Sequence, residues 1–209
     1  MRQLLLDRDY DSINMGHIAA RAGLARNTLY NYAGDKSALV LAVTQRAGRP
    51  VVERVAAIAA RVADPAADRM REIIEAVLEA FTDQVLQLIF RQGPALPVAA
   101  VPKGPDSPFH AIVVEVENVV RDGIAHGEFR DAGDVHLVVE LLSGVMRVGA
   151  ERIGRDPAAF AATVRAARDI ILASLARRPG RPSRGSGRPF ATGSLWCADA
   201  VGASGLSRS

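Results

Sequence analysis

The chain of 209 residues is poor in cysteine and in aromatic side chains. Cys197 is the only cysteine, so no disulfide can form within the chain, and this favours a reducing cytoplasm. Aromatic residues make up 5% of the sequence while Ala, Val and Leu are frequent, which favours helices over a β-sandwich. No apolar stretch reaches about 18 residues and the first one is too short for a secretory signal, so we expect no membrane partner.

The sequence also lacks the motifs of the common enzyme classes. The four histidines, at positions 17, 110, 126 and 136, are scattered without a metal-ligand spacing. No nucleophile elbow, phosphate loop or dinucleotide fingerprint occurs. We therefore expect a binding protein without a catalytic site, a metal or a cofactor.

The positive charge is concentrated at the C-terminal end. Residues 177–209 carry a net charge of +5 and the rest of the chain a net charge of −2. Of the 32 residues at 178–209, 20 are Gly, Ser, Pro or Arg, so we predict a disordered basic tail there. Residues 1–46 are only mildly basic, so any attraction of this region to DNA must come from clustered charges.

Residues 14–33 have the pattern of two short helices joined by a tight turn. Asn14 is a good N-cap, and Ile18 lies on the apolar face of the first helix. Gly23 can enter the left-handed conformation that closes this helix, and Leu24 is expected to anchor the turn in the core. This arrangement is typical of a helix-turn-helix, which places its second helix in the major groove of DNA.

The second helix of the pair, which is expected to begin near residue 26, is unusually polar. Leu29 is its inward-facing residue, while Asp35 and Lys36 begin the helix that follows. Guanidinium, amide and hydroxyl groups suit phosphate oxygens and base edges. The helix supplies them through Arg26, Asn27, Thr28, Tyr30, Asn31 and Tyr32.

Residues 10–43 resemble the DNA-binding domain of the tetracycline-repressor (TetR) family of bacterial transcription regulators. The matching elements are Tyr10, the IAxxAG run at 18–23, the TLYxY run at 28–32, and the Asp35-Lys36 pair followed by Ala38 and Leu39. The resemblance implies that Arg26, Asn27, Thr28 and Tyr30 face bases and nearby backbone, and that Tyr32 and Lys36 grip phosphates. Asn14 and Asn31 complete the expected DNA-binding residues.

We predict an all-α protein with a three-helix helix-turn-helix domain at 1–46, a helical effector-binding and dimerisation domain at 47–177, and the tail at 178–209. The chain starts at Met1 and offers only Arg2 to Asp9 for a helix before Tyr10, so the first helix is expected to be shortened, by a mis-assigned start or a genuine truncation. This leaves an alternative open, a dimeric helical small-molecule-binding protein whose DNA binding is weakened or lost.

Apolar residues recur every three or four positions through the second region, which predicts further helices. Gly48 and Pro50 are expected to kink or break the first of them, and Asp64 to cap the second. The expected helices cover 35–62, 65–81, 83–91, 108–124, 135–153 and 157–177, with a loop at 93–108.

The last two expected helices carry broad apolar faces. One interpretation is ordinary core within one chain. The resemblance instead implies pairing with a second copy, and we favour a homodimer with Val145 and Ile171 in its interface.

The resemblance further implies a ligand-responsive repressor that binds a palindromic double-stranded DNA operator and an unknown small-molecule effector. The effector pocket is expected among the later helices, with apolar walls and a few polar contacts. Our candidates are Phe81, Gln84, Gln87, Arg91, His110, Ile112, Val138, Met146 and Arg147.

Overall fold

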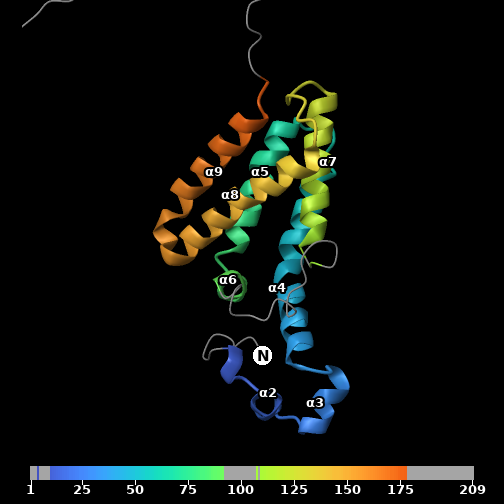
Figure 1. The fold of residues 1–209 in the computed structure, drawn as a ribbon, viewed down its shortest axis with the longest axis vertical. Helices are drawn as coiled ribbons and strands as arrows, with labels where there is room; N and C mark the ends of the chain where they lie inside the picture. The colour runs from blue at the N-terminus through green and yellow to red at the C-terminus, as the bar shows by residue number, and fades with distance from the viewer. Residues whose placement is uncertain (1–3, 5–9, 92–106, 108, 178–209) are drawn as a thin grey trace, which may run out of the picture. The chain divides into compact units, whose positions relative to one another are not determined.

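The computed structural model describes residue 4, residues 10–91, residue 107 and residues 109–177, and in these parts the chain is helical (Figure 1). No strand occurs in the described ranges, where the only β-type pairing is an isolated bridge between Phe129 and Ala176. The all-α prediction is confirmed. The elements are η1 (Tyr10–Ser12), α2 (Met15–Ala22), α3 (Arg26–Tyr32), α4 (Lys36–Ala59), α5 (Ala66–Ala80), α6 (Gln84–Arg91), α7 (His110–Ala125), α8 (Val135–Arg155), η3 (Pro157–Ala159) and α9 (Phe160–Leu175).

The described residues belong to one compact unit, which ends at Arg178. The predicted basic tail and all of the first helix except Leu4 lie outside the described residues. The predicted domain boundary at residue 46 falls inside α4, so the division into two domains stays a prediction. None of the helices in the described ranges is long and apolar enough to cross a membrane.

The helix-turn-helix forms where its sequence signals predict it. The side-chain oxygen of Asn14 accepts a hydrogen bond from the backbone N–H of His17 at 2.9 Å and so caps α2. Gly23 ends α2 with a φ of 66°, a left-handed conformation that glycine adopts without steric cost. Leu24 does not anchor the turn, because its side chain is 39% exposed.

The N-terminal core is small and apolar. Ile13, Ile18, Leu29 and Val40 are buried in it, and Leu4 joins them from the N-terminal segment. Val85 of α6 belongs to the same cluster, so α6 touches the apolar interior of the helix-turn-helix. Leu29 thereby anchors α3, whose opposite face is left to the solvent.

The larger core lies among α4, α5, α7, α8 and α9. Helix α5 is central, because it packs against each of the other four (Figure 1). Fully buried members of this core include Met70, Ile74, Leu78, Val120 and Ile153.

Helix α4 is not broken at Gly48 and Pro50, so the predicted break does not occur, while a kink there stays a prediction. It runs without interruption from Lys36 to Ala59, with Pro50 inside it. Proline costs one backbone hydrogen bond, but the buried side chains of Val51 and Val55 hold the following turns in the core. Gly48 instead permits a close approach, since a Cβ there would lie 2.6 Å from the ring of Phe109.

Helix α5 is capped from a distant part of the chain, whereas Asp64 was predicted to cap it. Pro65 occupies the N-cap position and makes no side-chain bond. The carboxylate of Glu128 accepts from the backbone N–H groups of Ala66 and Ala67 at 2.9 and 3.1 Å. A carboxylate at this place also interacts favourably with the positive end of the helix dipole.

Helix α8 begins at Val135 as predicted, whereas α9 begins at Phe160, three residues after the predicted start, because Pro157–Ala159 form the 3-10 helix η3. Asp134 accepts from the backbone N–H of Leu137 at 3.0 Å and caps α8, while Asp156 accepts from that of Ala158 before α9. The assignment of Ile171 to a dimer interface is wrong, because Ile171 is 2% exposed within the core of one chain. Val145 is half-buried against the same core.

Candidate DNA-binding face and effector cavity

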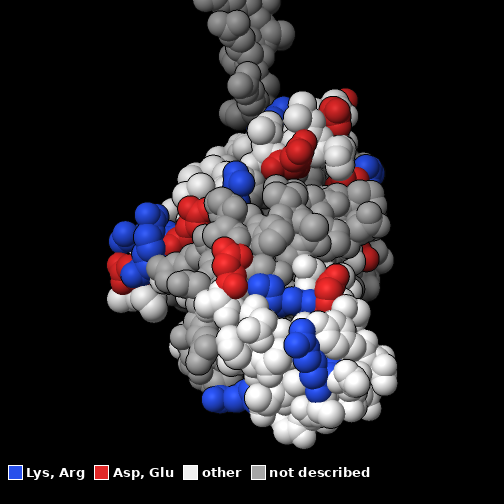
Figure 2. All heavy atoms as spheres, turned by 60° about the horizontal axis from the view of Figure 1, so that its bottom comes forward, with Lys and Arg blue, Asp and Glu red and all other residues white. Residues whose placement is uncertain are grey.

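The exposed face of α3 carries most of the polar residues predicted to meet DNA. Arg26, Asn27 and Asn31 are exposed, and Tyr32 is 79% exposed. Figure 2 shows the end of the unit that carries the helix-turn-helix, where Lys and Arg side chains stand among uncharged ones. The exposed ring and hydroxyl of Tyr32 are accessible to a binding partner.

Two of the predicted contact residues also interact with each other. The guanidinium of Arg26 donates to the hydroxyl of Tyr30 at 3.4 Å and lies 5.6 Å from the centre of its ring. This pair, four residues apart on α3, holds the guanidinium on the exposed face of the helix.

The remaining predicted DNA contacts are Asn14, Thr28 and Lys36. Asn14 uses its side-chain oxygen to cap α2, and Thr28 and Lys36 are half-buried. Lys36 begins α4 directly after the Asp35 cap. Contact of each of these residues with DNA stays a prediction.

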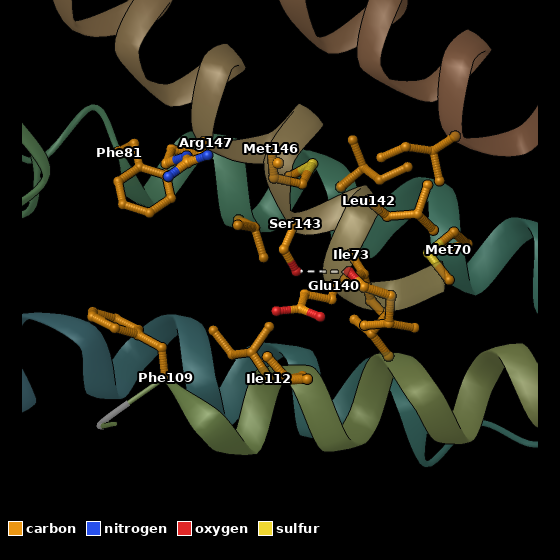
Figure 3. A pocket seen from close by; sticks show the side chains of 17 residues that line it. Met70, Ile73, Phe81, Phe109, Ile112, Glu140, Leu142, Ser143, Met146 and Arg147 are labelled. Atoms are coloured by element: carbon orange, nitrogen blue, oxygen red, sulfur yellow. Dashed lines mark hydrogen bonds between the residues drawn. The ribbon is translucent and has the colours of Figure 1, made fainter. Parts of the chain in front are cut away.

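A cavity of about 450 Å³ lies between α5, α7 and α8 (Figure 3). This volume is typical of sites for small organic ligands. Its walls are mostly apolar, and its lining residues are Met70, Ile73, Ile74, Val77, Phe81, Phe109, Ile112, Val113, Val116, Val139, Glu140, Leu142, Ser143, Gly144, Met146, Arg147 and Ile171.

The cavity brings together four of the nine predicted effector residues, namely Phe81, Ile112, Met146 and Arg147. Gln84, Gln87, His110 and Val138 are not among the lining residues. Gln87 instead lies beside Gly154 of α8, and Val138 packs against the large core. The side chain of Arg91 lies outside the described residues.

Sequence reasoning missed two polar residues of the cavity, Glu140 and Ser143. Together with Arg147 they have the spacing i, i+3, i+7, which places all three on one side of α8. The Ser143 hydroxyl donates to the backbone carbonyl of Val139 at 2.8 Å. Within the described parts of the chain, neither Glu140 nor Arg147 forms a hydrogen bond or an ion pair.

The cavity wall also touches α4, the helix that follows the helix-turn-helix. Phe109 lines the cavity and lies against Gly48 of α4. Phe81, another lining residue, shares a buried cluster with Leu86 of α6. A displacement of Phe109 or Phe81 would therefore change the packing against α4 or α6, and both helices contact the N-terminal core.

We expect Gly48→Ala to be less stable than a matched Gly144→Ala variant by about 1–3 kcal/mol. Alanine gains about 1 kcal/mol in a helix, but at residue 48 its Cβ would meet the ring of Phe109 at 2.6 Å. Gly144 is helical and also lines the cavity, and a Cβ there would meet nothing within 4 Å. Urea unfolding of both variants measures the difference, and equal stabilisation by the two substitutions would contradict the close contact.

One ion pair joins α7 to the first turn of α8. Nδ1 of His136 lies 2.6 Å from Oε1 of Glu117, and Arg121 binds the other oxygen of Glu117 at 2.7 Å. The hydrogen bond to Glu117 raises the pKa of His136 above its ordinary value of 6.5. The hydrogen bonds from His136 and then Arg121 lower the pKa of Glu117 below its ordinary value of 4.5.

This pair gives the stability a defined pH dependence. The stabilisation that His136 gives to the folded state is fully present below pH 6.5. It is lost as the pH rises through the raised pKa of His136. The contribution of Glu117 is complete above pH 4.5 and is lost as the pH falls through its lowered pKa. We expect His136→Gln to destabilise the protein more at about pH 5.5 than at about pH 9 in urea unfolding. The same dependence should vanish in a Glu117→Gln background, and a pH-independent effect would contradict the prediction.

Comparison with known proteins agrees with the helix-turn-helix and the helical fold. Residues 2–43 match the family profile described as bacterial regulatory proteins, tetR family. No curated protein sequence matches the chain. Among solved structures, a putative tetR family transcription regulator from Shewanella sp. PV-4 is similar, with a TM-score of 0.68, 19% identity, and coverage of 85% of this chain and 94% of that one.

Two further structures have the same fold. The transcriptional regulator FadR from Bacillus subtilis, in complex with stearoyl-CoA, has a TM-score of 0.64 at 15% identity, covering 83% of this chain and 95% of that one. SmeT, the repressor of the Stenotrophomonas maltophilia multidrug efflux pump SmeDEF, has a TM-score of 0.64 at 17% identity, covering 85% and 91%.

The fold and the matched N-terminal residues define a helical protein with an N-terminal helix-turn-helix and the fold of transcriptional regulators. The N-terminal segment at residues 2–43 is thus similar to the tetR family of bacterial regulatory proteins, and the rest of the described chain shares the fold of the solved structures above.

Proposed function

We propose that this protein is a ligand-responsive transcriptional repressor that binds a palindromic DNA operator as a homodimer. The observation that carries the proposal is the connection of two sites by one helix. The exposed polar face of α3 leads directly into α4, and Gly48 of α4 touches Phe109 of the apolar cavity. Repression is favoured because SmeT, which has this fold, is described as a repressor. A regulator of bacterial operators works in the cytoplasm.

The cavity supports an effector of small organic type. FadR, with this fold, was solved with stearoyl-CoA bound. In the present chain, an effector that contacts Phe81 and Phe109 can favour one arrangement of α4 and α6 over another. The effector acts as an inducer only if its affinity is higher for the arrangement that cannot bind the operator than for the arrangement that can.

The exposed apolar residues of the last helices support a homodimer. Leu137, Leu141 and Val148 of α8 are 50%, 66% and 60% exposed, and Ile170 of α9 is 55% exposed. The three residues of α8 follow a helical spacing, so they form one stripe on its outer side. Two copies joined through such a stripe would present two α3 helices to a palindromic site.

The experiment that tests the proposal is DNA binding to the upstream region of the protein's own gene, with random DNA as the comparison. We expect Tyr32→Phe and Lys36→Ala to weaken binding to both DNAs. Lys36→Ala should also reduce the slope of log affinity against log salt by about one unit, since one phosphate contact is lost.

Base contacts should behave differently from phosphate contacts. We expect Arg26→Ala and Asn27→Ala to weaken the free energy of binding to the specific site by about 1–3 kcal/mol for each base pair that the residue contacts. Binding to random DNA should not change. Arg61→Ala is the control, because Arg61 lies after α4 and pairs with Asp64 and Glu72 instead.

Two results would count against these assignments. If all four substitutions weaken specific and random binding equally, the division into base and phosphate contacts is wrong. If the protein binds neither DNA but does bind ligands, the alternative of a helical ligand-binding protein without DNA binding is correct.

A further inference from the structure

The buried part of the cavity offers no polar side chain to a ligand. The polar residues among those described in its lining are Glu140, Ser143 and Arg147, and all three are exposed. Every lining residue that is buried or half-buried has an apolar side chain, apart from Gly144, which has none. A polar group that entered this interior would give up its hydrogen bonds to water without finding new ones, which is costly. The part of a ligand that fills the cavity is therefore apolar.

The three exposed residues, which form the polar edge of the cavity, do not call for a particular charge on the ligand. Glu140 acts electrostatically on His136, one turn earlier in α8. The Ser143 hydroxyl donates to the backbone carbonyl of Val139 at 2.8 Å. Because Glu140 and Arg147 are exposed, a ligand that fills the apolar interior leaves both of them in water. One is acidic and the other basic, so the polar edge favours neither sign of charge.

The polar edge lies apart from the stripe through which we propose that two copies associate. Leu137, Leu141 and Val148 form that stripe on α8. With about 3.6 residues per helical turn, Glu140 and Arg147 are displaced from the stripe by roughly a quarter of a turn. A partner seated on the stripe would therefore face another side of α8, and the polar group of a ligand can stay in water at the polar edge.

The apolar lining is long compared with the volume that it encloses. Along α5 it extends from Met70 to Phe81, which corresponds to roughly 16 Å at about 1.5 Å per residue. Figure 3 shows Phe81 and Phe109 at one end of the cavity and Met70 at the other. A volume of about 450 Å³ spread over this length is narrow, so it fits an extended chain better than a bulky ring system.

We infer that the effector is an amphiphile with one unbranched apolar chain, which the cavity selects by length. The chain fills the space between α5, α7 and α8, while the polar head stays in water and is not selected by its charge. The inference rests on the proposed function of the cavity as the effector site, and it adds the chemical class of the effector.

A series of alkyl probes tests this inference by calorimetry on the full chain. The probes have chains of about six to twelve carbons and carry a carboxylate, a hydroxyl or a trimethylammonium head, each below its micelle concentration. We expect each added methylene to raise the affinity about fourfold until the cavity is full. At one chain length, exchanging the head should change the affinity by less than about fourfold, that is, by less than one methylene does. An increase in salt of about tenfold should not separate the carboxylate probe from the ammonium probe.

Two neighbouring valines of α7 provide matched variants. Val113 lines the cavity and is half-buried, whereas Val114 is 40% exposed and is not among the lining residues. Val113→Phe should shorten the chain length at which the affinity stops rising and weaken the longest probes by about tenfold or more, because the ring takes up cavity space. Val114→Phe is the control and should bind every probe as the wild type does. Val113→Ile replaces Val113→Phe if far-UV circular dichroism shows that the larger substitution unfolds the protein, and it should weaken the longest probes in the same direction.

An affinity that does not rise with chain length, or no binding by any probe, would overturn the inference. So would a change of head that alters the affinity by more than one methylene does, or equal effects of the substitutions at Val113 and Val114. The proposed function fails separately, through absence of binding to the upstream DNA without any probe.

Discussion

Replacing Asp122 by alanine should lower the free energy of unfolding by about 3–5 kcal/mol, because it leaves a buried guanidinium unpaired. Arg69 of α5 is 2% exposed. It donates to the backbone carbonyl of Ala59 at 2.9 Å and to Asp122 at 3.1 Å, and so connects α5 to the end of α4 and to α7. Asp122 itself is 37% exposed, so the cost comes mainly from the arginine that stays buried.

A double-mutant cycle separates this explanation from a general loss of packing. Arg69→Met keeps an apolar side chain of similar length and leaves the partly exposed Asp122 to water. The double variant Arg69→Met/Asp122→Ala should therefore be more stable than Asp122→Ala alone. Urea unfolding followed by far-UV circular dichroism, at one protein concentration, gives all four free energies. Additive losses in the double variant would contradict the buried-charge explanation.

The features that sequence reasoning predicted correctly depend on neighbours in the chain. Asn14, Asp35 and Asp134 cap helices by bonding a backbone N–H three residues further on. Gly23 ends α2 through its own backbone freedom. In such an interaction both partners lie within one helical turn of each other, so a short stretch of sequence contains both of them.

The features that it missed depend on residues that are distant in the chain. Glu128 caps α5 from 62 positions away, and no local pattern marks it as a capping residue. Pro50 stays within α4 because tertiary packing holds that helix, an effect that a local rule for proline omits. Ile171 has the apolar character expected of an interface, but the same character suits a core, and only the fold decides between them.

The candidate sites show the same division. The polar face of α3 could be predicted because residue type and helical spacing define it. The cavity could be predicted only in part. An apolar stripe indicates which residues face the interior, but it does not indicate which of them line an empty space instead of packing against another side chain. Glu140 and Ser143 had a detectable signal, because they share the side of the helix that carries Arg147.

The second large effect is expected at the exposed stripe of α8, where Leu141→Glu should convert the proposed dimer to a monomer. Leu141 is 66% exposed in one chain, with Leu137 and Val148 on the same stripe. In a symmetric dimer the substitution occurs twice, and an unpaired carboxylate in an apolar interface costs several kcal/mol. A loss of about 3 kcal/mol or more would raise the dimer dissociation constant over roughly a hundredfold.

The matched control is Val114→Glu on α7. Val114 is 40% exposed but lies outside α8 and α9, so this variant should remain dimeric. Light scattering at micromolar concentration measures the mass of each variant, and far-UV circular dichroism should show that both remain helical. Ile171→Glu would not serve, because a charge at a residue that is 2% exposed would disturb the core of each chain.

Loss of the dimer should also abolish specific DNA binding. A monomer presents a single α3 helix and loses the contacts to the second half-site of a palindrome. Binding of the upstream region by Leu141→Glu should therefore fall to the level of random DNA, while Val114→Glu binds as the wild type does. A dimeric Leu141→Glu variant would show that the copies associate through another surface. A monomeric variant that keeps full specific affinity would show that one helix-turn-helix is sufficient for recognition.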